Sequence, residues 1–141
     1  MLIGRWLSRC KEVIEGEAGT INKYLGDGLF AYWPATPLTP ARLVQALGAL
    51  RRLQAEAEPR FRLVLHHGQV VMGGRASMGE ESLSGTEVNF IFRMEKLAAA
   101  IRQTRLLSEA AAQQLGASLT TTPVGQHALP GFAGEHAFLS F

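Results

Sequence analysis

The sequence predicts an α+β fold, one domain spanning residues 1–141, in which helices form a layer on a sheet. Helical and strand patterns alternate along the chain without an internal repeat. A hydrophobic content of 47% is enough for one buried core. An amphipathic helix followed by a hairpin is typical of the second half of a ferredoxin-like split β-α-β unit. Because the chain opens directly on this helix, we expect the first strand of that unit to be absent here and to lie before Met1.

Each expected element follows from a local pattern. Apolar residues recur every three or four positions in the helices, and the strands are β-branched or aromatic runs. Gly26-Asp27-Gly28 is typical of a tight hairpin turn, and Thr39 and Ser108 are typical helix caps. In order, we expect a helix at 2–16, strands at 20–25 and 29–33, a helix from Thr39 to Pro59, a strand at 61–72 that bends at Gly68, a short strand at 82–84, a helix from Thr86, a strand at 105–107, a helix from Ser108 to Gly116, and strands at 118–124, 126–129 and 136–141.

Composition excludes several classes of function. No apolar run approaches the roughly 18 residues that span a bilayer, so we expect no membrane contact from this segment. Cys10, the single cysteine, cannot form an internal disulfide, which favours a cytoplasmic location. It falls on an apolar helical stripe, so we expect an inert buried thiol. The net charge of +2 comes from scattered arginines, and nothing indicates a nucleic-acid partner.

Lysine and aspartate are rare in a chain that otherwise uses arginine and glutamate. Lysine occurs only at Lys11, Lys23 and Lys96, and aspartate only at Asp27. Lys23 and Asp27 nevertheless stand in one short segment. This placement suggests that arginine cannot replace Lys23 and that glutamate cannot replace Asp27.

Four segments carry a family resemblance. They are Gly19–Ala31 with Lys23 four residues before Asp27, Arg62–Gly73 with its His66-x-Gly68 pattern, Ser84–Glu95 with Gly85-Thr86-x-Val88-Asn89-x-x-x-Arg93, and Leu129-Pro130-Gly131-Phe132. In this order and at these separations they resemble the catalytic domain of class III adenylyl and guanylyl cyclases, of the threonine-type subgroup. The last segment is similar to a Leu-Lys-Gly-Phe turn of that family. The resemblance covers nearly the whole chain.

The resemblance implies a nucleotidyl cyclase domain with an antiparallel-rich sheet and helices on one face. It implies conversion of ATP to cyclic AMP and pyrophosphate by a head-to-tail homodimer with shared active sites. Asp27 is expected to bind Mg²⁺ or Mn²⁺ in a two-metal site. The expected roles of the other residues are adenine recognition by Lys23 and Thr86, orientation of the ribose by Asn89, and neutralisation of phosphate charge by Arg93.

The residues themselves support parts of this assignment. Thr86, Asn89 and Arg93 stand at i, i+3 and i+7, which aligns them on one helical face. Lys23 shares strand parity with Ile21, so we expect it to project from an apolar side. There an ammonium needs an acceptor, and adenine N1 is one whereas guanine N1 carries a proton.

Plainer alternatives remain open at this stage. Asp27 can be a turn residue only, and the stem of Lys23 can extend to solvent. Thr86 can be a helix cap, with Asn89 and Arg93 on a solvated face. His66 and the adjacent His67 are expected to point to opposite faces and to be structural rather than metal ligands.

Two departures from the family pattern qualify the functional prediction. The first metal aspartate of the family lies on the strand expected before Met1, so one metal ligand is missing from this chain. The segment Phe90-Ile91-Phe92 is bulkier than the small residues usual before Arg93, which implies altered packing beside the site. The alternative prediction is a catalytically inactive pseudo-cyclase that dimerises or binds nucleotide without turnover.

Overall fold

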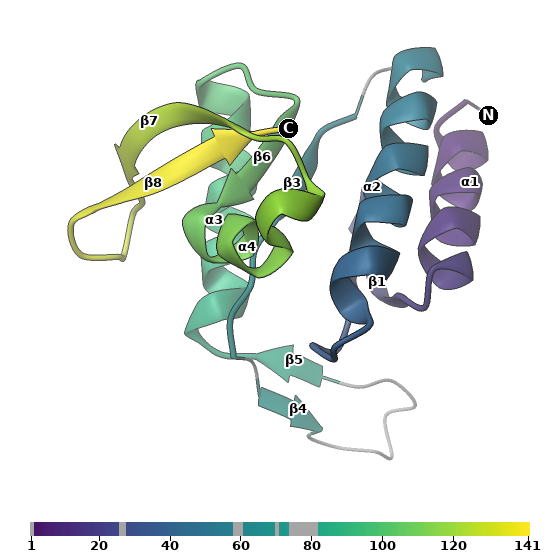
Figure 1. Ribbon diagram of the computed structural model, residues 1–141, viewed down its shortest axis with the longest axis horizontal. Coiled ribbons are helices and arrows are strands. Elements are labelled where there is room, and N and C mark those ends of the chain that lie inside the picture. The colour runs from purple at the N-terminus through teal and green to yellow at the C-terminus, as the bar shows by residue number, and fades with distance from the viewer. Residues whose placement is uncertain (1, 26–27, 58–60, 70, 74–81) are drawn as a thin grey trace. The chain divides into compact units, whose positions relative to one another are not determined.

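A computed structural model describes residues 2–25, 28–57, 61–69, 71–73 and 82–141 of the chain. These residues form two compact units, Met1–Phe61 and Arg62–Phe141, each with its own helices and strands (Figure 1). The α+β prediction is confirmed, and so is the predominance of antiparallel pairing. That the two units form one domain, with all helices on one face of a sheet, stays a prediction.

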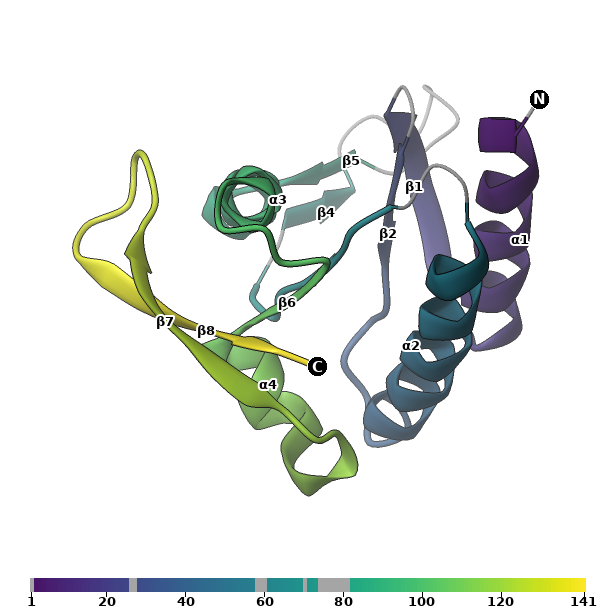
Figure 2. The ribbon, with the colours of Figure 1, turned by 90° about the horizontal axis from the view of Figure 1, so that it is seen from above.

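The first unit is a helix pair with a hairpin. It comprises α1 (Leu2–Gly16), β1 (Thr20–Leu25), β2 (Gly28–Tyr32) and α2 (Thr39–Glu56). Helices α1 and α2 lie side by side in both Figure 1 and Figure 2, and β1 pairs antiparallel with β2. The expected boundaries of both helices and both strands are met to within a few residues, except that Thr39 is not a cap. Its hydroxyl donates to the Pro34 carbonyl at 2.6 Å and so fixes the approach to α2.

Apolar stripes of the two helices form the core of this unit. Cys10 and Ile14 of α1 are buried, as are Leu47 and Leu50 of α2. One polar side chain, Gln54, is also buried, and its Nε2 donates to the Phe61 carbonyl at 2.7 Å. A buried amide needs such a partner, because leaving it unpaired would cost about 1–3 kcal/mol.

The second unit contains a four-stranded sheet with the order β3-β6-β8-β7 and a separate pair, β4-β5. Its elements are β3 (Leu63–Leu65), β4 (Val71–Gly73), β5 (Ser82–Ser84), α3 (Thr86–Ala100), β6 (Arg105–Ser108), α4 (Glu109–Leu115), a 3₁₀ turn at Gly116–Ser118, β7 (Thr122–Ala128) and β8 (Glu135–Ser140). Strands β3 and β6 are parallel, with α3 in the crossover between them. The other pairs are antiparallel.

Helix α3 packs its apolar face on this sheet. Met94 and Ala98 of α3 are fully buried, and they meet Leu106 of β6 and Phe138 of β8 in one cluster. Figure 2 shows α3 end-on, beside the ribbon of β6, β8 and β7. Because this face is buried, the opposite face of α3 is turned to solvent.

Two strand predictions need correction. The strand expected at 61–72 is not continuous, since β3 ends at Leu65 and β4 begins at Val71. His66, the residue after β3, has its side chain hydrogen-bonded to Ser108 and Glu87. The strands expected at 118–124 and 126–129 are one strand, β7, with an irregularity between Pro123 and Gln126. Between these residues Gly125 has φ of 97°, which strand backbone does not adopt, so the pairing is shifted there without ending the strand.

Candidate functional site

The predicted trio of α3 lines one open pocket in the second unit. Its volume is about 550 Å³, within the range of ligand sites. The lining residues are Thr86, Asn89, Phe92, Arg93, Lys96, Pro130, Gly131 and Phe132. Thr86, Asn89, Arg93 and Lys96 follow one another at i, i+3, i+7 and i+10, so they form a single polar stripe on the helix. The pocket therefore contains all three residues predicted from the helical spacing.

The first turn of α3 leaves the hydroxyl of Thr86 outside the helix cap. Gly85 is the capping residue, with φ of 117°, and no side chain accepts a capping hydrogen bond there. Such a φ strongly favours glycine. The alternative reading of Thr86 as a cap is thus wrong, and Thr86 is one of the residues that line the pocket.

The opposite wall is a tight turn. The N–H of Phe132 donates to the Leu129 carbonyl at 3.0 Å, and Gly131 has φ of 86°. Proline followed by a glycine with positive φ is the preferred chemistry of a type II turn. The ring of Phe132 packs edge-on against Phe90, with centroids 5.2 Å apart. The turn is therefore held against α3 by aromatic packing.

The bulky Phe90 explains part of the unusual packing expected beside the site. It is 8% exposed and stacks on His66 at 4.2 Å, as well as meeting Phe132. His136 and Phe138 of β8 complete the ring cluster at 5.4 and 6.2 Å. One side chain thus connects the helix, the turn and the sheet.

A chain of hydrogen bonds anchors the first turn of α3 to the sheet. Both ring nitrogens of His66 are engaged, Nδ1 with Ser108 Oγ at 2.7 Å and Nε2 with Glu87 Oε2. A neutral ring protonated at Nε2 satisfies both contacts, with the Ser108 hydroxyl donating to Nδ1. Ser108 Oγ also accepts from the N–H of Ala111 and caps α4, as predicted.

Burial lowers the pKa of His66, against the opposing effect of its hydrogen bond to Glu87. The side chain of Glu87 approaches so closely that a Cβ at Gly68 would lie 2.6 Å from its carboxylate. A Cβ at position 68 would therefore force the Glu87 side chain to shift from its contact with His66. These contacts agree with the structural role predicted for His66.

The two other predicted site residues belong to the first unit. Asp27 lies outside the described residues. Lys23 is exposed, and β1 carries an irregularity between Ile21 and Lys23. Ile21 pairs with Ala31 and Lys23 with Phe30, neighbours that point to opposite faces of β2. The predicted parity of Lys23 with Ile21 is therefore wrong, because a bulge adds one residue between them.

The described residues include no group of three His, Cys, Asp or Glu side chains placed to hold a metal ion. Mg²⁺ usually takes only one or two carboxylates from protein and its remaining ligands from water and substrate phosphates. A single carboxylate beside a phosphate site is therefore compatible with such an ion. Over the same described part of the chain, no helix is both long and apolar enough to cross a bilayer.

Two pocket features escaped the sequence prediction. Lys96 continues the stripe one turn beyond Arg93, a spacing that could have been read from the sequence. The Leu129–Phe132 turn carries a family motif, but the sequence alone does not place it beside α3. Its position against α3 depends on ring packing between distant segments, which spacing along the chain does not reveal.

No protein-family model matches the chain, and no curated protein does. Solved structures do match. The adenylyl cyclase CyaB from P. aeruginosa is 19% identical with a TM-score of 0.74, over 99% of this chain and 79% of that one. The guanylyl cyclase Cya2 is 17% identical with a TM-score of 0.74, over 99% and 77%. The guanylate cyclase domain of RhGC from Catenaria anguillulae, in complex with GTP, is 15% identical with a TM-score of 0.74, over 98% and 80%.

These similarities confirm the predicted resemblance at the level of the fold. The chain has the fold of adenylyl and guanylyl cyclase catalytic domains over nearly its whole length. Both substrate types occur among the similar structures. The choice between ATP and GTP must therefore be argued from the residues of the site.

Proposed function

We propose that this chain is the catalytic domain of a class III adenylyl cyclase, which converts ATP to cyclic AMP and pyrophosphate. The observation that carries the proposal is the joint placement of Thr86, Asn89 and Arg93 in one pocket of a cyclase-like fold. These three side chains supply a hydroxyl, an amide and a guanidinium along one helical stripe. A nucleotide presents a base, a ribose and phosphates in the corresponding order along its length.

The reaction needs orientation and charge stabilisation more than covalent help from the protein. The ribose 3′ oxygen attacks the α-phosphorus and loses its proton to water. A new P–O bond forms, and the bond to the oxygen that bridges to the β-phosphorus breaks to release pyrophosphate. Asn89 holds the ribose so that the 3′ oxygen lies in line with the leaving group. Arg93 stabilises the negative charge that grows on the phosphate oxygens.

The preference for ATP is assigned to Lys23 and Thr86. An ammonium donates to N1 of adenine but not to the protonated N1 of guanine, and Thr86 Oγ is able to accept from the adenine amino group. The exposed position of Lys23 suits a donor that is desolvated only when a nucleotide and a second chain cover it. We expect Lys23→Glu to weaken or redirect the base preference.

Asp27 is proposed to hold Mg²⁺ or Mn²⁺ beside the phosphates. A divalent ion there would neutralise phosphate charge. In the proposed homodimer, Asp27 of one chain faces Lys23, Thr86, Asn89 and Arg93 of the other. Each active site would thus be shared between two copies.

The direct test is to incubate the purified chain, extended by the expected first strand with its metal aspartate, with ATP and Mg²⁺ or Mn²⁺ and to measure cyclic AMP. In this extended chain we expect turnover that Arg93→Ala lowers about 100- to 1,000-fold, the usual cost of removing one group that stabilises developing charge. Arg52→Ala, on an exposed face of α2, is the matched control and should leave turnover unchanged. ATP binding without turnover would contradict the proposal and support a pseudo-cyclase.

Sharing of the site is tested by mixing two inactive variants. An Asp27→Ala chain and an Arg93→Ala chain should together regain activity, because a heterodimer contains one intact site. Oligomeric mass is measured alongside. A mixture that forms heterodimers but regains no activity would show that each chain has a self-contained site.

A further inference from the structure

The pocket has an uneven charge distribution along α3. Its N-terminal end carries the neutral side chains of Thr86 and Asn89, and its far end carries Arg93 and Lys96. Among the described residues no acidic side chain lines it. One end of the pocket therefore suits an uncharged group and the other a strong anion.

The acids of α3 do not neutralise these two cations. Glu95 pairs with Arg62, whose Nη2 lies 2.5 Å from Glu95 Oε1, and Glu87 pairs with His66. Within the described part of the chain, neither Arg93 nor Lys96 belongs to an ion pair. Like charges at i and i+3 destabilise a helix by a few tenths of a kcal/mol. An anion between them would reverse that effect.

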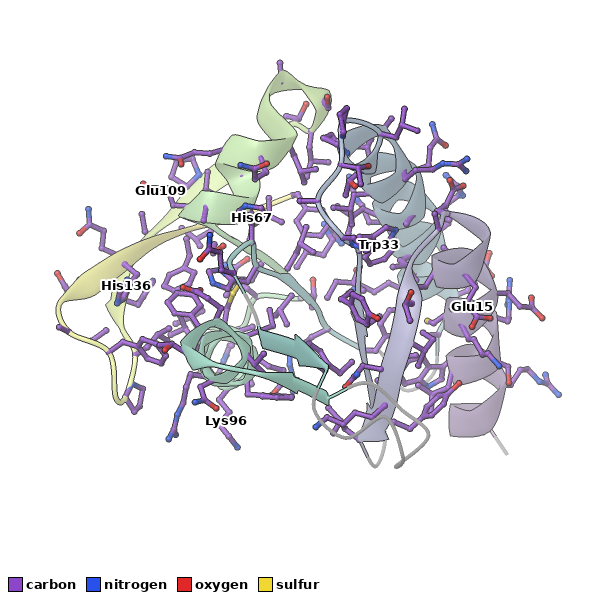
Figure 3. All side chains as sticks on the ribbon, turned by 90° about the horizontal axis from the view of Figure 1, so that it is seen from below. Glu15, Trp33, His67, Lys96, Glu109 and His136 are labelled. Atoms are coloured by element: carbon purple, nitrogen blue, oxygen red, sulfur yellow. The ribbon has the colours of Figure 1, made fainter. Side chains whose placement is uncertain are left out.

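The facing turn contributes no charge of its own. Pro130 stands where the similar family turn has a lysine, and Gly131 has open space where a Cβ would be. Lys96 is thus the one ammonium that lines the described pocket. Figure 3 shows its side chain projecting outward from α3. The chain otherwise strongly prefers arginine, so a lysine here is itself unusual.

We propose that Lys96 is a second phosphate-binding residue of this pocket, which with Arg93 binds the terminal phosphates of a nucleoside triphosphate and then the pyrophosphate product. This inference rests on the proposed function, which assigns a nucleotide to the pocket. Lys96 follows Arg93 by three residues, which is about 4.5 Å along the helix axis. At this separation the two cations are able to bind neighbouring phosphates. The compact ammonium binds as a point charge, whereas the guanidinium of Arg93 binds oxygens in pairs.

The helix dipole argues for the opposite orientation, since it favours anions at the N-terminus of α3. That end, however, carries Glu87 in its first turn. The dipole amounts to about half a charge at each end, against two full charges at Arg93 and Lys96. The phosphates are therefore directed away from the helix N-terminus.

The test compares ligands that differ in their phosphates. Binding to the full chain is measured by calorimetry with 3′-deoxy-ATP, which lacks the attacking oxygen, and with AMP and pyrophosphate. Lys96→Gln should weaken the binding of 3′-deoxy-ATP and of pyrophosphate about 10-fold and leave the binding of AMP unchanged. Lys96→Arg should restore most of the loss. If the chain turns over ATP, Lys96→Gln should raise KM rather than lower kcat.

The matched control is Lys11→Gln, which removes the same charge from an exposed position on α1. It should change none of the three affinities. Equal weakening of AMP and 3′-deoxy-ATP by Lys96→Gln, or no change in either, would overturn the inference. Cyclase activity of the unaltered chain tests the proposed function separately. If the unaltered chain is active and Lys96→Gln changes none of the affinities, only the role of Lys96 is rejected.

Discussion

Replacing Phe90 by alanine tests the packing that joins the candidate site to the sheet. The ring is 8% exposed and lies within 4.2 to 6.2 Å, centroid to centroid, of four other rings. Removal of a buried phenylalanine costs about 3–5 kcal/mol through lost burial and the cavity left behind. This changes the unfolding equilibrium of the second unit about 150- to 5,000-fold. It is a large part of the roughly 5–15 kcal/mol that stabilises a typical domain.

The measurement is unfolding in guanidinium chloride. A loss of this size should lower the midpoint by roughly 1 M with little change in the slope. Phe92→Ala is the matched control, because Phe92 lies on the same helix but is only half-buried, so its loss should be smaller. Phe90→Ala should also weaken nucleotide binding, since Phe132 loses the ring that holds it in the pocket wall. A loss below about 1 kcal/mol at unchanged slope would refute the central role given to Phe90.

Three further predictions concern single side chains. Because burial lowers the pKa of His66, the unfolded chain binds a proton at this ring more readily than the folded chain does. The neutral ring therefore contributes its full stability above pH 6.5, and this stability is lost as the pH falls from 6.5 towards the lower pKa of the folded state. The stability advantage of the wild type over His66→Gln should therefore shrink between pH 7.5 and 5.5, as measured by urea unfolding. Cys10 is buried, and burial raises its pKa to about 11, so that labelling by iodoacetamide at pH 8 should be at least about 100-fold slower in the folded chain than in urea. Ser108→Ala removes the cap of α4 and the partner of His66, and should cost about 1–2 kcal/mol in thermal unfolding.

Each of these predictions has its own contradicting result. A wild-type advantage over His66→Gln that is constant with pH would show that burial of the neutral ring is unimportant. Rapid labelling of Cys10 in the folded chain would mean that α1 opens readily. For the cap of α4, Ser108→Thr is the conservative variant because it keeps the hydroxyl. If Ser108→Thr lowers the stability as much as Ser108→Ala does, crowding at this buried position matters rather than the hydrogen bonds of the hydroxyl.

Local patterns in the sequence determined most of the secondary structure and the composition of the helical stripe. The expected helices agree with α1, α2 and α4, and the spacing of Thr86, Asn89 and Arg93 placed them on one face of α3. Helical periodicity and turn chemistry act between near neighbours, so they can be read directly from the chain. Family motifs added the fold class, which the similar structures confirm.

Only the tertiary structure decided what lies opposite and beneath that stripe. The turn at Pro130 forms the facing wall because aromatic rings from distant segments meet at Phe90. His66, just after β3, bonds to side chains of β6 and α3 that are distant in the sequence. A bulge reverses the face of Lys23 relative to Ile21. Such contacts depend on packing and register between separate elements, which no local pattern specifies.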